Sequence, residues 1–261
     1  YKTKMSFELV KEVRQITGAG ISDVNKALRE ADGYKDKAIE ILRKQGQQMA
    51  DKKSARQTKE GVIAIARQDK KLAVVEIYCE TDFVARNEDF VAAVQSMADK
   101  LLELDKGKFE SWAEDEIKNN LIVKIGENLQ LGKFDIITGD VVGFYLHSNK
   151  KVASVVVLSG GDEELAKNIA MHATAMAPGY LKPADVPEDV IAKEKEIYTE
   201  QLKKEGKPEE MIDKIMTGKI QKFYTEVCLL KQAYVKDDKQ SIEDLAKSTG
   251  AEVVSFAYFS L

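Results

Sequence analysis

Hydrophobic residues recur at helical spacing in three short stretches near the N-terminus, which predicts a three-helix module between about residues 4 and 47. The first stretch ends in Thr-Gly-Ala-Gly at residues 17–20, where glycine suits the left-handed backbone that closes a helix. Ser22 is placed to cap the second helix, and Asp32-Gly33 to end it. A module this small has little core and usually serves in docking. We expect a polar linker, roughly residues 45–59, to follow it.

Beyond this linker the order strand, turn, strand, loop and helix occurs twice, which predicts a duplicated α+β core. The strand-like runs are residues 62–65 and 72–77 in the first copy and residues 141–145 and 152–157 in the second. The interval from Lys71 to the first helical anchor, Phe90, is five residues longer than the matching interval from Lys151 to Leu165. The first copy therefore carries an insertion that the fold itself does not require.

The five extra residues fall between Cys79 and Asn87, and the tip of this segment, Thr81-Asp82-Phe83-Val84, is too apolar for an ordinary turn. One alternative is that Phe83 and Val84 fold back into their own core. Because the second copy lacks the insertion, we favour a binding role in which a loop held between a strand and a helix presents Phe83.

A later segment, about residues 188–226, predicts two antiparallel helices around Gly206-Lys207-Pro208. Its apolar stripe needs cover from the parent domain or from another protein, and an exposed helical hairpin often serves as an oligomer contact. A short helix capped at Ser241 and a last strand over residues 252–259 close the chain.

The composition is that of an ordinary globular chain, with 32% charged and 44% hydrophobic residues and a net charge of -4. The acidic balance argues against nucleic acid as a partner, although the run of Lys and Arg at residues 52–59 leaves an RNA-binding accessory protein as the alternative. No apolar run is long enough for a membrane span. Cys79 and Cys228 match no metal spacing, which favours free thiols in a reducing compartment.

Catalytic and nucleotide-binding patterns are missing from the sequence. The two histidines, His147 and His172, have no acid or nucleophile at a supporting spacing. Gly160-Gly161-Asp162 lacks the pattern of a phosphate-binding loop. We expect His172, on an apolar helix face, to be structural, and His147, at a strand end, to be exposed and available for contact. The sequence predicts neither an enzyme nor a resident cofactor or metal.

Several motifs, taken in order and spacing, carry a resemblance to a known family. They are Thr17-Gly18-Ala19-Gly20, Thr81-Asp82-Phe83-Val84-Ala85-Arg86-Asn87, Lys124-Ile125-Gly126-Glu127-Asn128, Ala170-Met171-His172, Gly206-Lys207-Pro208-Glu209 and Lys222-Phe223-Tyr224-Thr225-Glu226-Val227. The chain resembles the elongation factor Ts family, guanine-nucleotide exchange factors of elongation factor Tu. The resemblance implies the following domains: a ubiquitin-associated-like module with linker (1–55), core subdomain N (56–140), core subdomain C (141–187 and 228–261) and a hairpin used for dimerisation (188–227).

The resemblance also implies which residues contact elongation factor Tu. The family assigns Thr81, Asp82, Phe83 and Val84 to dislodging magnesium from the partner. Within this assignment Asp82 has two alternative roles: its charge competes for the magnesium, or its side chain caps the turn that presents Phe83. The remaining contacts that it implies are Arg14, Ile21, Ile125, Gly126, His147 and Val235.

The expected compartment is the bacterial cytoplasm, or an organelle matrix or stroma after removal of a transit peptide, because the chain begins at Tyr1 rather than Met. Two departures from the family pattern qualify these expectations. Residues 23–25 (Asp-Val-Asn) are less cationic than in some members, and the chain ends at Leu261 without the terminal helix that some relatives carry.

Overall fold

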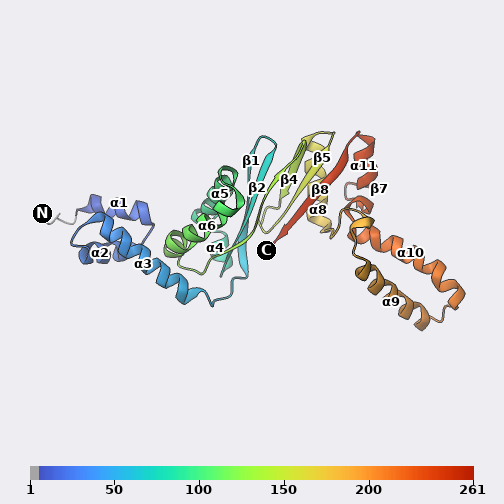
Figure 1. Ribbon diagram of the computed structural model, residues 1–261, viewed down its shortest axis with the longest axis horizontal. Helices are drawn as coiled ribbons and strands as arrows, with labels where there is room; N and C mark the ends of the chain where they lie inside the picture. The colour runs from blue at the N-terminus through green and yellow to red at the C-terminus, as the bar shows by residue number, and fades with distance from the viewer. Residues whose placement is uncertain (1–5) are drawn as a thin grey trace. The chain divides into compact units, whose positions relative to one another are not determined.

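The computed structural model describes residues 6–261, apart from the side chain of Glu210, and contains both helices and small sheets, as expected for an α+β protein. The chain forms two compact units (Figure 1). The first ends at Ile137 and takes in Leu261, and the second comprises Thr138–Ser260. The start that the sequence suggests for the N-terminal module, residue 4, lies outside the described residues. Within residues 6–261, no helix combines the length and the apolar character needed to cross a membrane.

The N-terminal module consists of α1 (Phe7–Thr17), α2 (Ile21–Glu30) and α3 (Lys35–Lys53). The hydroxyl of Ser6 caps α1, and Gly18 ends it with the predicted left-handed backbone (φ 67°). Asp32 and Gly33 also have positive φ angles after α2, which confirms the predicted stop. The prediction that Ser22 caps α2 is wrong, because the helix begins at Ile21 and Gly20 occupies the cap position.

The polar linker predicted over residues 45–59 is also wrong for most of its length, because α3 continues to Lys53. The reason is a close contact that a hydrophobic pattern does not reveal. A Cβ atom added to Gly46 would lie 2.5 Å from a methyl carbon of Val123, so the helix approaches the core through a small residue. Next to it, the side-chain amide of Gln47 donates to Asn119 over 3.0 Å. Only residues 54–59 connect the module to the first strand.

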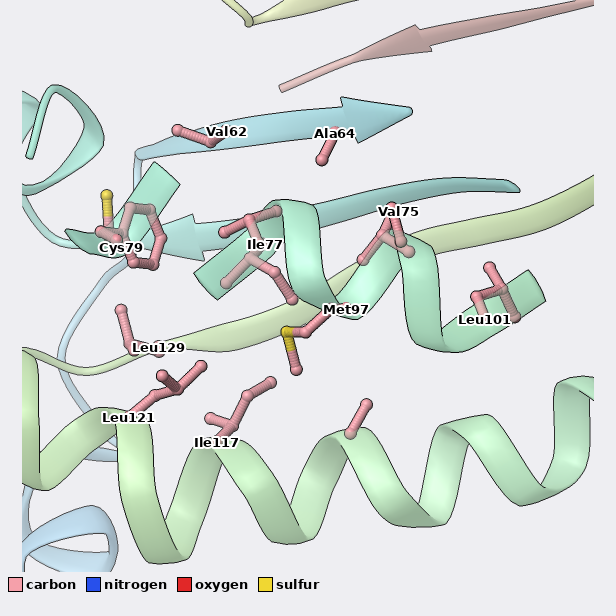
Figure 2. Close-up of a cluster of buried hydrophobic side chains, with 14 of the residues drawn as sticks. Val62, Ala64, Val75, Ile77, Cys79, Met97, Leu101, Ile117, Leu121 and Leu129 are labelled. Atoms are coloured by element: carbon pink, nitrogen blue, oxygen red, sulfur yellow. The ribbon is translucent and has the colours of Figure 1, made fainter. Parts of the chain in front are cut away.

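The first core sheet has the strand order β1-β2-β3, formed by β1 (Glu60–Gln68), β2 (Lys71–Cys79) and β3 (Gln130–Thr138). β1 and β2 are antiparallel around a two-residue turn in which Asp69 adopts a positive φ of 51°. Helix α5 (Glu88–Glu103) packs on this pair (Figure 1). Figure 2 shows Val62 of β1, Ile77 of β2 and Met97 of α5, which belong to one buried core.

Three helical segments between α5 and β3 were not predicted. They are α6 (Lys106–Glu116), a π-helical turn (Ile117–Leu121) and α7 (Ile122–Ile125). Ile117 and Leu121 of the π-helical turn belong to the same buried core and lie beside Leu129 (Figure 2). The N-terminal module contacts the core here, because α3 packs on the π-helical turn and on α7.

The second unit repeats the arrangement of the first. Its sheet has the order β4-β5-β8, and helix α8 packs on β4 and β5. These elements are β4 (Val141–Leu146), β5 (Val152–Ser159), α8 (Glu163–Met176) and β8 (Glu252–Ser260). In each unit an antiparallel strand pair precedes the helix, and a third strand from later in the chain lies beside the second. The duplication predicted from the sequence is therefore confirmed for the strand pair and helix, and it extends to a third strand.

The remaining elements of the second unit lie between α8 and β8. They are α9 (Glu188–Lys204), α10 (Glu209–Val227), β6 (Ala233–Tyr234), β7 (Asp237–Ser241), α11 (Ile242–Ser248) and two short 3-10 turns (Pro183–Asp185 and Leu229–Lys231). As predicted, Ser241 caps α11. Helices α9 and α10 pack on each other, and Leu202, Ile212 and Ile220 are buried. Ile197 and Met211 on the same helices remain about half exposed.

Candidate functional site

The insertion in the first unit forms a helical turn. Residues 80–87 separate β2 from α5, whereas only residues 160–162 separate β5 from α8, so the first copy has the five predicted extra residues. The inserted segment contains the four-residue helix α4 (Asp82–Ala85) and is not an open loop. Thr81 is the N-cap of this turn, and its Oγ1 accepts a hydrogen bond of 3.4 Å from the amide of Val84.

The apolar residues of this turn divide between the core and solvent. Val84 and Ala85 pack against the core of the first unit. The alternative that Phe83 and Val84 fold back into their own core is therefore correct for Val84. Phe83 is 83% exposed. A large aromatic side chain is therefore held outward on a turn whose other face is anchored. This arrangement suits a contact surface, because isolated phenylalanine side chains are normally buried.

Asp82 does not cap the turn, so the capping alternative for its side chain is wrong. Thr81 fills that position, and the carboxylate of Asp82 instead forms an ion pair of 3.0 Å with Arg86, one helical turn later. Both side chains are substantially exposed, at 45% for Asp82 and 81% for Arg86. Exposed pairs at this spacing contribute only about 0.3–0.5 kcal/mol, so the carboxylate can exchange Arg86 for another cation at little cost.

A second segment, residues 125–128, is tied to the start of α4 by hydrogen bonds that the sequence does not reveal. The Glu127 carboxylate accepts the amide N–H groups of Glu80 (3.0 Å) and Thr81 (3.1 Å), and the Thr81 hydroxyl donates to it over 2.6 Å. In return, the Glu80 carboxylate accepts the amide N–H of Asn128 over 2.6 Å. Arg56 forms an ion pair of 3.4 Å with Glu80 and thereby offsets one of the two negative charges. We call this reciprocal arrangement of Glu80 and Glu127 the carboxylate brace.

The carboxylate brace brings two sets of expected contact residues together. Ile125 ends α7 and is partly buried against the core, whereas Gly126 is exposed with a left-handed φ of 85°. The Lys53 ammonium donates to the carbonyl of Gly126, which links this corner to the end of α3. A Cβ added to Gly126 would meet nothing within 4 Å, so its surface is open to a partner.

Arg14 and Ile21 form a separate group on the N-terminal module. They line one cavity of about 280 Å³ together with Phe7, Val10 and Asn25. Phe7 is 84% and Ile21 53% exposed, so this is an apolar surface with one guanidinium at its edge. Asn25 belongs to residues 23–25, the segment that is less cationic than in some members of the family. The cationic side chains that line the cavity are Arg14 and Lys11.

The two remaining predicted contacts lie in the second unit. His147 is exposed just after β4, as expected, and its Nδ1 lies 3.4 Å from the hydroxyl of Tyr145. Val235 is 48% exposed, and its amide donates to Nδ1 of His172 over 3.3 Å. His172 is fully buried and also bonds Gln232 through Nε2 (3.0 Å), which confirms its structural role. Burial lowers the pKa of His172, so the neutral imidazole supports the backbone of Val235.

The described residues offer little reactive chemistry. Across residues 6–261, no three histidine, cysteine or acidic side chains gather as metal ligands. Both cysteines are buried, and burial raises the pKa of the Cys228 thiol to about 11. A thiol with so high a pKa is a poor nucleophile. Cys79 donates from Sγ to the carbonyl of Thr81 over 3.3 Å and so supports the base of α4. The exposed features of these sites are apolar tips and charges suited to binding a macromolecule.

Comparison with known proteins agrees with this description. A sequence model of the family described as Elongation factor TS matches residues 80–261. Curated relatives named Elongation factor Ts include those of Hydrogenobaculum sp. (strain Y04AAS1), 41% identical over 98% of both chains, and Hahella chejuensis (strain KCTC 2396), 41% identical over 98% of this chain and 92% of the relative. The relative from Francisella tularensis subsp. novicida (strain U112) is 43% identical over 97% of this chain and 91% of the relative. The chain therefore belongs to the elongation factor Ts family.

Proposed function

We propose that this translation elongation factor binds elongation factor Tu in its GDP-bound form and promotes release of GDP, so that GTP can be loaded. As a member of its family the protein is a nucleotide exchange factor and not an enzyme. Its action is to stabilise the nucleotide-free partner, and no covalent bond of the nucleotide needs to break.

The observation that carries the proposal is the exposure of Phe83 on α4. The side chain is 83% exposed, and α4 is held by the Thr81 cap, by the carboxylate brace and by packing of Val84 on the core. The second copy of the core folds without such a turn. A rigid apolar tip that folding does not require is the feature expected of a probe that enters another protein.

Exchange follows from competition between this tip and the nucleotide. A GTPase holds its nucleotide through backbone donors, a lysine and a magnesium ion that bridges phosphate oxygens. We infer that Phe83 and Asp82 enter beside this site and perturb the magnesium and the phosphates. By linkage, a factor that weakens GDP binding is itself bound more weakly when GDP is present. Burying one phenylalanine supplies only about 1.5–3 kcal/mol, so further contacts must anchor the factor.

We assign that anchoring to the other expected contacts. The N-terminal module, as a ubiquitin-associated-like domain, would dock through the cavity that Arg14 and Ile21 line. The exposed corner at Gly126 would contact the partner beside α4, to which the carboxylate brace joins it. His147 and Val235 supply exposed positions on the second unit.

Two further parts of the proposal concern assembly and compartment. We propose that the hairpin of α9 and α10 forms a homodimer contact, supported by the exposed Ile197 and Met211. The bacterial sources of the relatives support the bacterial cytoplasm as the compartment rather than an organelle. RNA binding is not proposed, because Lys53 and Arg56 of the basic run already contact Gly126 and Glu80.

The direct test is a stopped-flow measurement of fluorescently labelled GDP leaving elongation factor Tu, with and without this chain. The proposal predicts release that accelerates with the concentration of the chain. Release at the intrinsic rate at every concentration, from a chain whose circular dichroism shows it folded, would exclude the proposed function.

A further inference from the structure

The shortness of α4 raises the question of what holds it in place. A four-residue helix is not stable by itself, because one turn fixes several backbone angles in return for a single hydrogen bond. Its conformation must therefore be imposed from outside. Val84 and Ala85 pack on the core and fix one face of the turn. The direction in which Phe83 points then depends on how the N-terminal end of α4 is held.

At that end, Glu127 determines the geometry of the cap. A threonine hydroxyl has one hydrogen to donate and lone pairs that accept. Thr81 donates this hydrogen to Oε1 of Glu127 over 2.6 Å, which leaves a lone pair directed to the amide of Val84 at 3.4 Å. The other oxygen of Glu127 accepts the two preceding backbone amides. One carboxylate thus fixes both the backbone that enters α4 and the rotamer of the residue that caps it.

We propose that Glu127 is the positioning residue of the exchange site, holding α4 so that Phe83 is presented in one direction. This inference rests on the proposed function and deepens it. Glu127 lies 46 residues after Thr81 in the chain and one residue after the exposed Gly126. The same side chain therefore sets the position of α4 relative to a second expected contact, and the two enter the partner as one rigid surface.

The first arm of the test measures α4 without any partner. Hydrogen exchange followed by mass spectrometry reports protection of the peptide that contains residues 80–87. Glu127→Ala removes the acceptor of two amides and should speed exchange in this peptide by about tenfold or more, since one hydrogen bond to a charged group corresponds to at least that factor. Glu127→Gln keeps the shape and an acceptor oxygen and should retain most of the protection. Unchanged protection of this peptide in Glu127→Ala would overturn the inference, whatever the rate of GDP release.

The second arm measures release of labelled GDP from elongation factor Tu. Glu127→Ala should lower kcat/KM by roughly tenfold, and Glu127→Gln should stay within about threefold of wild type. If Glu127 acts by presenting Phe83, the double variant Glu127→Ala/Phe83→Ala should be no slower than Phe83→Ala alone. Additive losses in the double variant, or a Gln variant as slow as the Ala variant, would show instead that Glu127 contacts the partner through its own charge.

Two further variants keep the result interpretable. Asp105→Ala removes another capping carboxylate of the same unit, one that accepts the amide of Lys108 over 2.9 Å at the start of α6, and should leave GDP release unchanged. Thr81→Val removes the hydroxyl that donates to Glu127 and leaves the two backbone amide bonds in place, so it is a milder change at the same cap. Its hydrogen exchange is compared with wild type if Glu127→Ala does not fold. A wild-type chain that fails to accelerate release would exclude the proposed function, whereas the hydrogen-exchange arm would still decide the role of Glu127.

Discussion

Phe83→Ala separates the proposed binding role of α4 from any role in folding. In the free protein the phenylalanine is 83% exposed, and it does not belong to the hydrophobic core on which Val84 packs. Surface substitutions of this kind change the free energy of unfolding by no more than about 0.5 kcal/mol. The thermal midpoint and the circular dichroism of the variant should therefore match those of wild type.

The expected effect on exchange comes from burial in the partner. A phenylalanine that passes from nearly full exposure to full burial contributes about 1.5–3 kcal/mol, and 1.4 kcal/mol corresponds to a factor of ten. Phe83→Ala should therefore lower kcat/KM for GDP release by roughly ten- to a hundredfold. A loss much smaller than tenfold would mean that the side chain stays largely in water in the complex.

The assay is stopped-flow release of labelled GDP over a range of factor concentrations, so that kcat and KM are obtained separately. Tyr34→Ala is a matched control, because Tyr34 is also an exposed aromatic residue (52%) and is not among the proposed contacts. Equal release rates for wild type and Phe83→Ala, with both chains folded, would refute the reasoning. Equal losses in Phe83→Ala and Tyr34→Ala would also refute it, because the effect would not be specific to α4.

Three other changes test the remaining features. Asp82→Asn should slow GDP release roughly three- to tenfold at millimolar magnesium, about 1 kcal/mol, and match wild type once magnesium is chelated; a match throughout a magnesium titration would exclude an electrostatic role. Replacing residues 192–219 by a short linker should preserve most exchange activity and lower the mass measured by light scattering, and an unchanged mass would exclude the dimer contact. Hydrogen bonds from Lys231 and Lys247 lower the pKa of Glu243 to about 2, so its stabilising contribution is present above pH 4.5 and is lost as the pH falls toward 2. Glu243→Gln should therefore lose less stability than wild type over that range in urea unfolding, and parallel losses would contradict the assignment.

The features that the sequence revealed depend on local patterns. The strand pairs, the helix that follows each pair and the length of the insertion are encoded by alternation and spacing within about thirty residues. The same comparison of the two copies predicts the exposure of Phe83, because the second copy folds its core without this insertion. The nearby Val84, which is equally apolar, packs inward instead.

The features that the sequence concealed depend on contacts between distant segments. Beyond residue 45 the sequence of α3 predicts a linker, because the docking surface of this helix consists of small residues such as Gly46 and Ala50. The carboxylate brace joins residues 46 to 48 positions apart, and in the sequence Glu80 and Glu127 are indistinguishable from solvated surface acids. Periodicity reports which face of an element is apolar, and it cannot report which distant backbone amide a carboxylate will reach.

The rigidity of α4 bears on how a single phenylalanine can have a large effect. Ordering a flexible loop during binding would cost about 1–2 kcal/mol for each residue fixed, which for a few residues exceeds what burial of Phe83 returns. In this chain, hydrogen bonds between Glu127 and Thr81 already fix the backbone in the free protein. In the proposed mechanism, most of the burial energy then remains to oppose GDP and magnesium. A helical turn held by a carboxylate from a distant segment therefore avoids the entropy cost of ordering, which an open loop of the same composition would pay on binding. This is why loss of the Glu127 contacts should reduce exchange even though Phe83 itself is unchanged.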